Sequence, residues 1–463
     1  MYGTIIINDS IQNCISLLGT YKEKLDDSGN MFILVKNEVD AIGDVTNDFF
    51  DVIFAASRIG YFYVNTIVAP TEERVNSNLP DNVLYIVWIA KDKNHFFNKD
   101  IIRESHIWKD VEWGKRAKNY NPKGKDPGNV WIPTKDDGKA HITEHILLSL
   151  SDIVNRLFKC SFQQGLKSLL ITSSYIRELA LNTEVQIEHK ENAVSTQPQY
   201  KTNNKNPKTV VPQNITGNII WGTSERMDRV PDSSINVVIT SPPYWDLKDY
   251  FKEGQIGQES YETYLNRLYR VWEGCYNKLI ESGSLWLNIN IRTKKGNVIL
   301  IPRDFILQCK KIGFHYKGVL IWHKSSGIPT HEKNIVDRHE YVLVFSKSES
   351  LNINNRICEF ADYKNDSING GLFWNINRKA GSVGKHFVHP AIYPNDLVSR
   401  IVRITTNEND TVLDPFLGSG TTLIASVIEG RNCFGYEYNE GFKDLILSRY
   451  NSEVGITDTL LIL

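Results

Sequence analysis

Cysteine is scarce in this chain, and the cysteines that occur are scattered. Six of them are spread over 463 residues, at positions 14, 160, 275, 309, 358 and 433. No two form a CxxC pair, and none has the spacing of zinc ligands. This pattern excludes the common structural zinc modules and argues against the dense disulfide framework of small secreted domains. We therefore expect reduced thiols, a cytoplasmic protein and no bound metal.

Long apolar runs and a strong net charge are also absent. No stretch approaches the roughly 18 apolar residues of a membrane-spanning helix. The amino terminus, Met-Tyr-Gly-Thr-Ile-Ile-Ile-Asn, has neither a basic region nor an apolar core of signal-peptide length. The formal net charge of −1 excludes a polycation as a whole. These absences predict a globular protein of about two or three domains that has no membrane partner.

Basic residues are nevertheless concentrated in one stretch. Between Arg292 and Lys324 the chain has eight lysines and arginines against one acid, Asp304. A basic face within a neutral protein fits a nucleic-acid groove. A solvated, lysine-rich surface would give the same count, so composition alone leaves both interpretations open.

Residues 240–245, Thr-Ser-Pro-Pro-Tyr-Trp, follow the apolar run 235–239, which is typical of a buried strand. Proline has no N–H and forces the preceding residue out of the α region, so this strand should end in a stiff, extended corner. Ligands of open α/β sheets bind outside the carboxyl ends of the strands. The corner offers the Ser241 hydroxyl, backbone carbonyls and the ring of Tyr244, which suit a flat, amino-bearing group such as a nucleobase. A surface turn is the alternative.

Further along, apolar residues at helical spacing predict a helix over residues 260–280.

A second motif, Asp414-Pro-Phe-Leu-Gly-Ser-Gly-Thr-Thr422, lies between a predicted strand and a predicted helix. Gly418 and Gly420 permit close backbone approach, and a helix N-terminus presents free N–H groups. The turn lacks the Walker lysine and the GxGxxG spacing of phosphate loops. An acid at the strand end suits a cationic amine, and Glu437, at the end of the next strand, has about the spacing at which an acid reaches ribose hydroxyls. Amine plus ribose without phosphate describes S-adenosylmethionine.

Together the two motifs resemble those of the S-adenosylmethionine-dependent DNA amino-methyltransferases. TSPPYW resembles the catalytic motif and DPFLGSGTT the cofactor motif, and their order is that of the circularly permuted β class. Residues 285–289 and 389–394 add supporting matches, and the resemblance covers roughly residues 214–450. It departs from the family at Gly222-Thr223, where Gly-Asp is frequent and contacts the cofactor adenine.

The resemblance implies a Rossmann-like, doubly wound α/β sheet, which the alternation of predicted strands and helices also indicates. It further implies transfer of a methyl group from S-adenosylmethionine to N4 of a flipped-out cytosine in double-stranded DNA, because Ser-Pro-Pro-Tyr usually accompanies cytosine and Asp-Pro-Pro-Tyr adenine. Ser241 Oγ and the Pro242 carbonyl would accept amino hydrogens, and Tyr244 would stack on the base. The implied site residues are Ser241, Pro242, Pro243 and Tyr244 for catalysis and Asp414, Phe416, Gly418, Gly420, Thr421 and Glu437 for the cofactor.

Other functions remain open at this point. An adenine-N6 methyltransferase would have the same fold, and so would a non-catalytic DNA-binding protein on a methyltransferase scaffold. Protein glutamine methyltransferases share a Pro-Pro-Tyr corner, but theirs begins with Asn and follows the cofactor motif. A 5-methylcytosine enzyme would need a Pro-Cys nucleophile, and the sequence has no such dipeptide. The family implies a bacterial or archaeal cytoplasm and a restriction endonuclease as a companion in the same system.

The first 180 residues are not a usual part of this family, yet four of their segments recur in the second half in the same order. The matching ranges are 27–35 with 281–289, 51–63 with 304–316, 85–91 with 341–347, and 145–156 with 389–400. Their nearly constant offset predicts a divergent internal duplication whose first copy has lost both motifs, with chance similarity of amphipathic segments as the alternative. We expect a degenerate methyltransferase-like domain at 1–180, a polar linker at 181–213 and the catalytic domain at 214–463.

This organisation suggests two roles for the first domain. It could replace a second subunit, which would make the chain a monomer with an internal pseudo-dimer; a homodimer is the alternative. It could also recognise DNA through residues 105–131, where tryptophans are interleaved with lysines and arginines. Residues 346–388 of the catalytic domain are the other candidate for target recognition.

Overall fold

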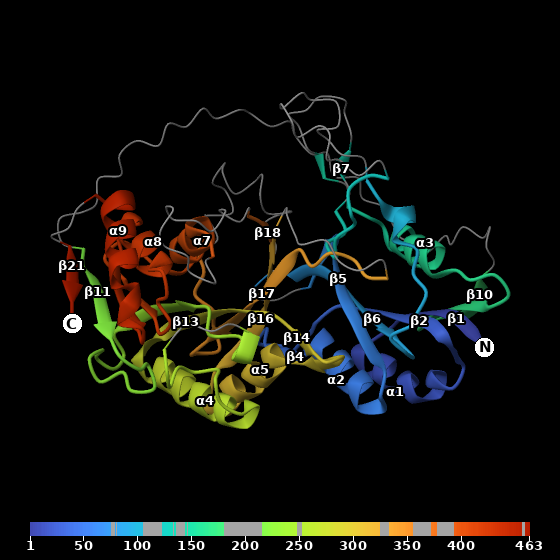
Figure 1. Cartoon of the computed structure of the whole chain (residues 1–463), viewed down its shortest axis with the longest axis horizontal. Helices are drawn as coiled ribbons and strands as arrows, with labels where there is room; N and C mark the ends of the chain where they lie inside the picture. Colours follow the sequence, from blue (N-terminus) through green and yellow to red (C-terminus); the bar gives the residue numbers. More distant parts are fainter. Residues whose placement is uncertain are drawn as a thin grey trace.

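The computed structural model describes residues 1–75, 79, 81–104, 123–132, 134–135, 144–145, 147–179, 215–247, 252–324, 333–354, 372–376, 393–455 and 459–463. The predicted linker at 181–213 lies outside the described residues, as do most of the candidate recognition segments at 105–131 and 346–388. The described chain forms two α/β halves that lie side by side along the long axis of the molecule (Figure 1).

The carboxy-terminal half is built on a nine-stranded sheet. In spatial order its strands are β18 (Phe373–Asn375), β16 (His315–His323), β17 (His339–Ser346), β13 (Leu279–Ile289), β12 (Ile235–Thr240), β19 (Thr411–Asp414), β20 (Asn432–Glu437), β11 (Gly217–Trp221) and β21 (Leu460–Ile462). Neighbouring strands are parallel except at β17, which is antiparallel to both β13 and β16. The strand with the corner therefore lies next to the strand with the glycine-rich turn.

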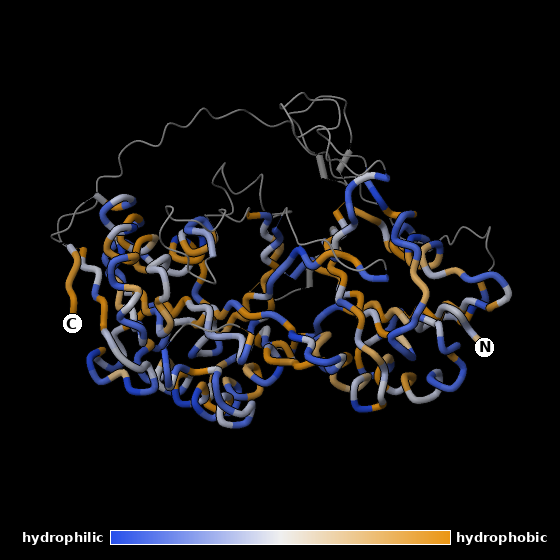
Figure 2. The backbone as a smooth tube through the Cα atoms, viewed as in Figure 1, coloured by the Kyte–Doolittle hydropathy of each residue, from blue (hydrophilic) through white to orange (hydrophobic). Residues whose placement is uncertain are grey.

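Helices cover both faces of this sheet, which confirms the predicted doubly wound α/β architecture. They are α4 (Tyr261–Lys278) and α5 (Ile301–Ile312) on one face, and α7 (Asn395–Thr405), α8 (Thr421–Ile428) and α9 (Lys443–Glu453) on the other. Alternate residues of β12 build the two cores, because successive side chains of a strand point to opposite faces. Val238 packs on the α4 side, and Val237 and Ile239 pack on the α8 side. Figure 2 shows apolar segments along the strands of both halves.

The amino-terminal half has a six-stranded sheet. In spatial order its strands are β10 (Ile176–Leu179), β9 (Lys167–Thr172), β1 (Tyr2–Asn8), β2 (Leu25–Val35), β6 (Asp81–Ala90) and β5 (Phe62–Val75). Its helices are α1 (Ile11–Lys22), α2 (Phe49–Ile59) and α3 (Leu150–Ser161). Short elements complete the described chain: β3 (Glu38–Val39), β4 (Val45–Asn47), β7 (Thr134–Lys135), β8 (Glu144–His145), β14 (Arg292–Lys294) and β15 (Asn297–Ile299), with 3₁₀ turns at Lys99–Ile102, Trp245–Leu247 and Glu440–Phe442.

The two sheets share a strand order. In the amino-terminal sheet five neighbouring strands run in the order β9-β1-β2-β6-β5, and in the carboxy-terminal sheet five run in the order β19-β12-β13-β17-β16. In both sets the first three strands are parallel, and the fourth, β6 or β17, is antiparallel to both of its neighbours. Both sheets have an irregular register at the same place. The register of β1 against β2 shifts between Leu25 and Asn30, and that of β12 against β13 shifts between Leu279 and Ser284. Lysine ammonium groups bind the carbonyl at the start of each jump: Lys91 Nζ lies 3.0 Å from Leu25 O, and Lys347 Nζ lies 2.7 Å from Leu279 O.

The halves differ where the motifs would lie. β1 leads into α1 through residues 9–10, whereas β12 leads into α4 through residues 241–260, which contain the corner. After β9 the chain turns back into the antiparallel strand β10, whereas after β19 it forms the glycine-rich turn and α8. Among its described residues, the amino-terminal half thus has neither the corner nor the turn.

The halves contact each other through helices and strands. Arg303 on α5 pairs with Asp51 on α2 at 3.0 Å, and His315 Nδ1 lies 2.7 Å from Asp44. A second contact is a backbone ladder in which Asn129 N donates to Val336 O and Val336 N donates to Pro127 O, both within 2.9 Å. No helix in the described part of the chain is long and apolar enough to cross a membrane.

Candidate active site

A pocket of about 870 Å³ opens where β12, β19 and β20 reach their carboxyl ends. This is the edge at which open parallel sheets bind ligands, since the loops that follow adjacent strands diverge there. Its walls include the corner, the glycine-rich turn, the end of β20 and the loop after β11. Among the lining residues are Gly222, Thr223, Ser241, Pro243, Phe416, Gly418, Thr421, Glu437 and Phe442.

The corner presents two oxygens that its own backbone does not use. Ser241 Oγ accepts a long hydrogen bond of 3.4 Å from Asn288 Nδ2. The Pro243 carbonyl is already occupied, because Tyr264 OH donates to it at 2.6 Å. In the described part of the chain nothing donates to the Pro242 carbonyl. Ser241 Oγ and Pro242 O are therefore the acceptors of the corner with capacity left, and of these two residues Ser241 is the one that lines the pocket.

Behind the corner lies a buried polar network centred on Glu340. Its Oε2 accepts hydrogen bonds from Tyr244 OH and Asn288 Nδ2, each at 2.8 Å. Its Oε1 lies 2.7 Å from Lys324 Nζ. Lys324 is the main favourable charge for the Glu340 carboxyl and, against burial, holds its pKa below the usual range. Tyr244 is thus fixed through its hydroxyl, while its ring packs against the core.

Trp245 ends the corner in a strained conformation. Its φ of 51° lies in the left-handed region, which costs a bulky residue about 1–2 kcal/mol. Contacts compensate for this: the indole Nε1 donates to Glu259 O at 2.9 Å, and Lys294 Nζ lies 4.3 Å from the ring centroid. Gly257 is needed beside it, because a Cβ there would come within 2.7 Å of Trp245 O.

Asp414, at the end of β19, is fully buried beneath the turn. Oδ1 accepts from Thr240 Oγ1 at 2.7 Å and from Phe416 N at 2.9 Å. Oδ2 accepts from Thr422 Oγ1 at 2.7 Å and from Tyr393 OH at 3.1 Å. A carboxylate has about four acceptor positions, and these four donors fill them. Asp414 therefore holds the turn in place and does not itself line the pocket.

Glu437, at the end of β20, does line the pocket and is 9% exposed. Oε2 accepts from Gly418 N at 2.8 Å, and Oε1 accepts from Asn439 N at 2.7 Å. Burial raises the pKa of this carboxyl to about 7, although both N–H groups oppose the shift. Each oxygen keeps an acceptor position, which suits a ligand with paired hydroxyls.

Glycine and apolar side chains shape the rest of the pocket. Gly418 and Gly420 have φ values of 56° and 82°, and Gly420 is the N-cap of α8. The aromatic rings of Phe416 and Phe442 give the pocket flat apolar surface. Thr223, at the position where the resemblance would place an aspartate, turns its hydroxyl to Glu225 at 3.3 Å.

The structure brings the predicted site residues of both motifs to one edge of the sheet. Ser241, Pro243, Phe416, Gly418, Thr421 and Glu437 line the same pocket. Pro242, Tyr244, Asp414 and Gly420 do not line it, and they support the residues that do. No cluster of His, Cys, Asp and Glu that could hold a metal occurs among the described residues.

Sequence reasoning missed several residues that build the site. Asn288 and Glu340 lie on strands β13 and β17, far from the corner in sequence, and Tyr393 precedes α7. One signal for Asn288 was available, since it is a polar residue within the apolar run 285–289 of a buried strand. Glu340 gives no comparable signal, because its neighbours in sequence are also polar or aromatic.

Comparison with known proteins matches the second half of the chain. A family model described as DNA methylase matches residues 235–448. The Type II methyltransferase M.SmaI of Serratia marcescens is 32% identical over 265 residues, 50% of this chain and 89% of the relative. M.Cfr9I of Citrobacter freundii, also a Type II methyltransferase, is 29% identical over 261 residues, 49% of this chain and 84% of the relative. A solved protein of Thermus thermophilus, complexed with S-adenosyl-L-methionine, is 26% identical with a TM-score of 0.42, covering 54% of this chain and 100% of that chain.

Proposed function

The chain belongs to the DNA amino-methyltransferase family, with S-adenosylmethionine as its cofactor, and on that premise we propose that it methylates the N4 amino group of cytosine in double-stranded DNA. The observation that carries the choice of base is the side chain at the start of the corner. Ser241 is a neutral hydroxyl beside the pocket, where adenine enzymes of this family usually have an aspartate.

The pocket suits the cofactor by the chemistry of its donors and acceptors. Glu437 would bind the ribose hydroxyls, and Phe416 and Phe442 would contact the adenine ring. The turn at Gly418 allows close approach of a ligand, because no side chain projects there. S-adenosylmethionine supplies a methyl group activated by a positively charged sulfonium.

The corner would act on a base that has left the DNA stack, since Ser241 cannot reach an amino group inside a duplex. An exocyclic amine is a weak nucleophile because its lone pair is delocalised into the ring. Ser241 Oγ and Pro242 O would accept the two amino hydrogens and so draw the amino group toward tetrahedral geometry, which localises the lone pair on the nitrogen. The same oxygens would stabilise the positive charge that develops on the nitrogen.

The network behind the corner keeps these acceptors in place. Asn288 links Ser241 to Glu340, and Glu340 fixes Tyr244. Preorganisation of this kind supplies rate by positioning. The sulfur–methyl bond would break as the nitrogen–methyl bond forms, and the positively charged methylated amine, which is a strong acid, would then release its proton to water without a general base.

Single-molecule sequencing of DNA methylated by the purified protein tests the proposal, because it reports the base, the position and the target site together. We expect N4-methylcytosine at one short sequence. Methyladenine without methylcytosine would contradict the choice of base, and unmodified DNA would contradict the activity.

We also propose that residues 1–180 form a degenerate methyltransferase-like domain that replaces a second subunit, with residues 181–213 as a linker and 214–463 as the catalytic domain. The shared strand order, the register jumps and the two lysine contacts support a common origin of the halves. Light scattering tests this: a chain that is monomeric in solution fits the proposal, and a stable homodimer would contradict it.

We propose, finally, that the enzyme is the modification half of a restriction system in a bacterial or archaeal cytoplasm. The names of the relatives, which are Type II methyltransferases, support this. The test is whether a nuclease in extracts of the source cell cleaves unmethylated DNA at the target site and spares DNA that the protein has methylated.

A further inference from the structure

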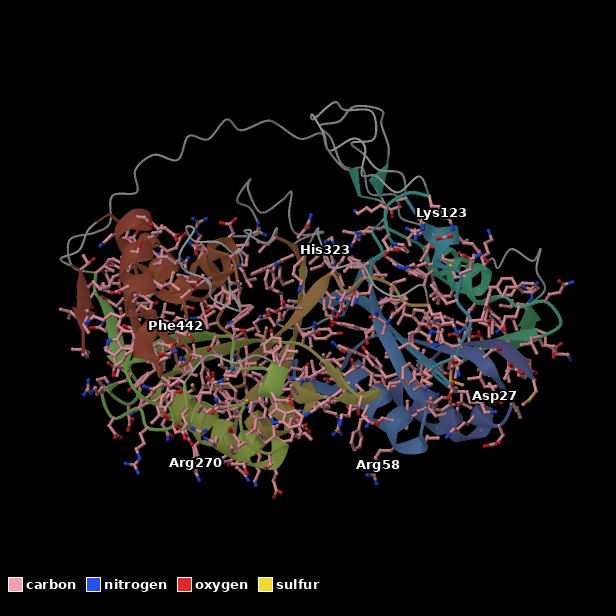
Figure 3. The ribbon with its side chains drawn as sticks, in the orientation of Figure 1. Asp27, Arg58, Lys123, Arg270, His323 and Phe442 are labelled. Atoms are coloured by element: carbon pink, nitrogen blue, oxygen red, sulfur yellow. The ribbon has the colours of Figure 1, made fainter. Side chains whose placement is uncertain are left out.

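A second pocket lies at the junction of the two halves and is unrelated to the cofactor pocket. It has a volume of about 510 Å³. Its walls come mainly from the amino-terminal half, and the catalytic half contributes His323 at the end of β16 and Arg338 just before β17. In Figure 3, His323 lies near the upper edge of the catalytic half, on the same side as Lys123 of the other half.

Three cations line this pocket together with two carboxylates, those of Glu104 and Asp126. Lys125, Arg156 and Arg338 form no salt bridge with any residue that the structure describes. Asp126, which also lines the pocket, is already paired with Lys99 at 2.9 Å and with Arg103 at 3.3 Å.

The three cations are partly buried, so their charges are incompletely solvated. Burial lowers the pKa of Lys125, and the adjacent Arg338 lowers it further, although Glu104 opposes both effects. Burial likewise lowers the pKa of the Arg338 guanidinium. These three cations outnumber the two carboxylates of the pocket, and a bound anion would relieve the cost of taking their charges partly out of water.

Two buried donors at the same place lack an acceptor. Trp131 Nε1 and Arg338 Nε have no hydrogen-bond partner among the residues described. Arg156 lies 5.9 Å from the centroid of the Trp131 ring, which places a second guanidinium beside the indole. Gly128 leaves room for the Arg338 side chain, because a Cβ there would lie 2.5 Å from Arg338 Cδ. The pocket therefore holds three cations and two N–H donors without an acceptor, against the two carboxylates of Glu104 and Asp126.

The pocket is also connected to the catalytic corner. Arg338 N donates to Asn129 Oδ1 at 2.8 Å, and Arg338 O accepts from Lys324 N at 2.6 Å. Glu340, which fixes Tyr244, follows Arg338 by two residues. β16 is parallel to β13 and β12 in the sheet, so the pocket lies at the same edge as the corner.

We propose that this pocket binds a backbone phosphate of the substrate DNA, held by Lys125, Arg156 and Arg338 beside the corner that receives the base. The assignment rests on the proposed function, because it takes DNA as the ligand. Phosphate oxygens are acceptors only and match cations and N–H donors, and arginine binds phosphate in a bidentate manner.

The experiment measures how the affinity for a duplex with the target site depends on salt, without S-adenosylmethionine so that no turnover occurs. Variants are Arg156→Gln and Lys125→Gln. Matched controls are Arg58→Gln, at the lower edge in Figure 3, and Lys167→Gln, whose side chain is 65% exposed. Binding of S-adenosylmethionine, measured by calorimetry, verifies that each variant is folded. If one of the two pocket variants does not fold, the other is sufficient for the test.

We expect each pocket variant to bind the DNA duplex about tenfold more weakly than the wild type at physiological salt. The slope of the logarithm of the DNA association constant against the logarithm of the salt concentration should become less steep by about 0.9, as for one lost phosphate contact. The controls should keep the wild-type slope. A wild type that methylates DNA while both pocket variants keep its slope would overturn this assignment alone. A wild type that neither binds nor methylates duplex DNA would overturn the proposed function as well.

Inorganic phosphate distinguishes a site for a free anion from a DNA contact. If it raises the melting temperature of the wild type but not of Arg156→Gln, while the DNA slopes stay equal, the pocket serves a free anion and the DNA assignment is wrong.

Discussion

The hydroxyl of Thr240 donates a hydrogen bond to Asp414 Oδ1 across 2.7 Å, inside the protein. Thr240 is the last residue of the strand that carries the corner, and Asp414 is the first residue of the cofactor motif. This buried contact joins the ends of two strands that are already paired in the sheet, and so helps to fix the corner relative to the turn.

Thr240→Val removes that hydrogen bond at nearly constant volume. We expect the free energy of unfolding to fall by about 1–3 kcal/mol, because a buried carboxylate loses a donor. Urea denaturation measures this, and Thr240→Ser, which retains a hydroxyl, should recover most of the loss. Equal stability of Thr240→Val and the wild type would show that the contact is not formed in solution.

Ser241→Ala removes an acceptor for the amino group without touching the cofactor side of the pocket. We expect kcat to fall by about a hundredfold or more, by analogy with the loss of one preorganised hydrogen bond at a reacting centre. The affinity for S-adenosylmethionine should stay the same. Ser350→Ala, at an exposed position, is the matched control and should retain full activity. An active Ser241→Ala enzyme would remove this serine from the mechanism.

Glu437 predicts a pH dependence of cofactor binding. Its pKa of about 7 in the free protein means that the carboxyl becomes protonated as the pH falls below 7 and loses acceptor capacity. The Kd for S-adenosylmethionine should therefore rise by up to about tenfold per pH unit below 7 and be nearly constant above it. Calorimetry at pH 6, 7 and 8 measures this, and Glu437→Gln should bind more weakly and without the dependence. If the wild type and Glu437→Gln show the same pH dependence of the Kd, another titrating group is responsible for it.

The pH dependence of the folding stability has the opposite sign to that of cofactor binding. Because folding raises the pKa of Glu437, its ionised form disfavours the folded state above pH 7, and this penalty is relieved as the pH falls toward the unfolded value. Glu437→Gln should accordingly stabilise the cofactor-free protein at pH 8 and have less effect at pH 5.

Glu340→Ala leaves the Lys324 ammonium, whose side chain is 11% exposed, without its partner. We expect a loss of about 3–5 kcal/mol in the free energy of unfolding. The double variant Lys324→Met with Glu340→Gln removes both charges and should be more stable than Glu340→Ala. If the single variant is as stable as the wild type, the pair does not support the corner.

Local motifs made much of the site predictable. The corner and the glycine-rich turn are continuous in sequence, and each follows a strand that its β-branched residues reveal. Glu437 could be found because it ends the next strand along the chain. The doubly wound sheet could be predicted as well, because strands that alternate with helices along the chain imply mostly parallel pairing.

Contacts between distant segments were not predictable. The sequence suggested that Asp414 meets a cationic ligand, but its donors Thr240 and Tyr393 come from other elements and occupy it. The predicted helix over 260–280 ends early, at Lys278, because Leu279 is extended and pairs with Ile235 as the start of β13. A tertiary partner decides that boundary, and helical spacing alone could not reveal it.

The short connection between β1 and α1 has a consequence for how DNA would be modified. Residues 9–10 leave no room for a second corner, so point mutations cannot restore one, and an insertion would be needed. A chain with one corner can modify one strand per encounter. At a palindromic target the duplex would pass through a state with one methylated strand, and the protein would have to leave and return in the opposite orientation to complete the modification.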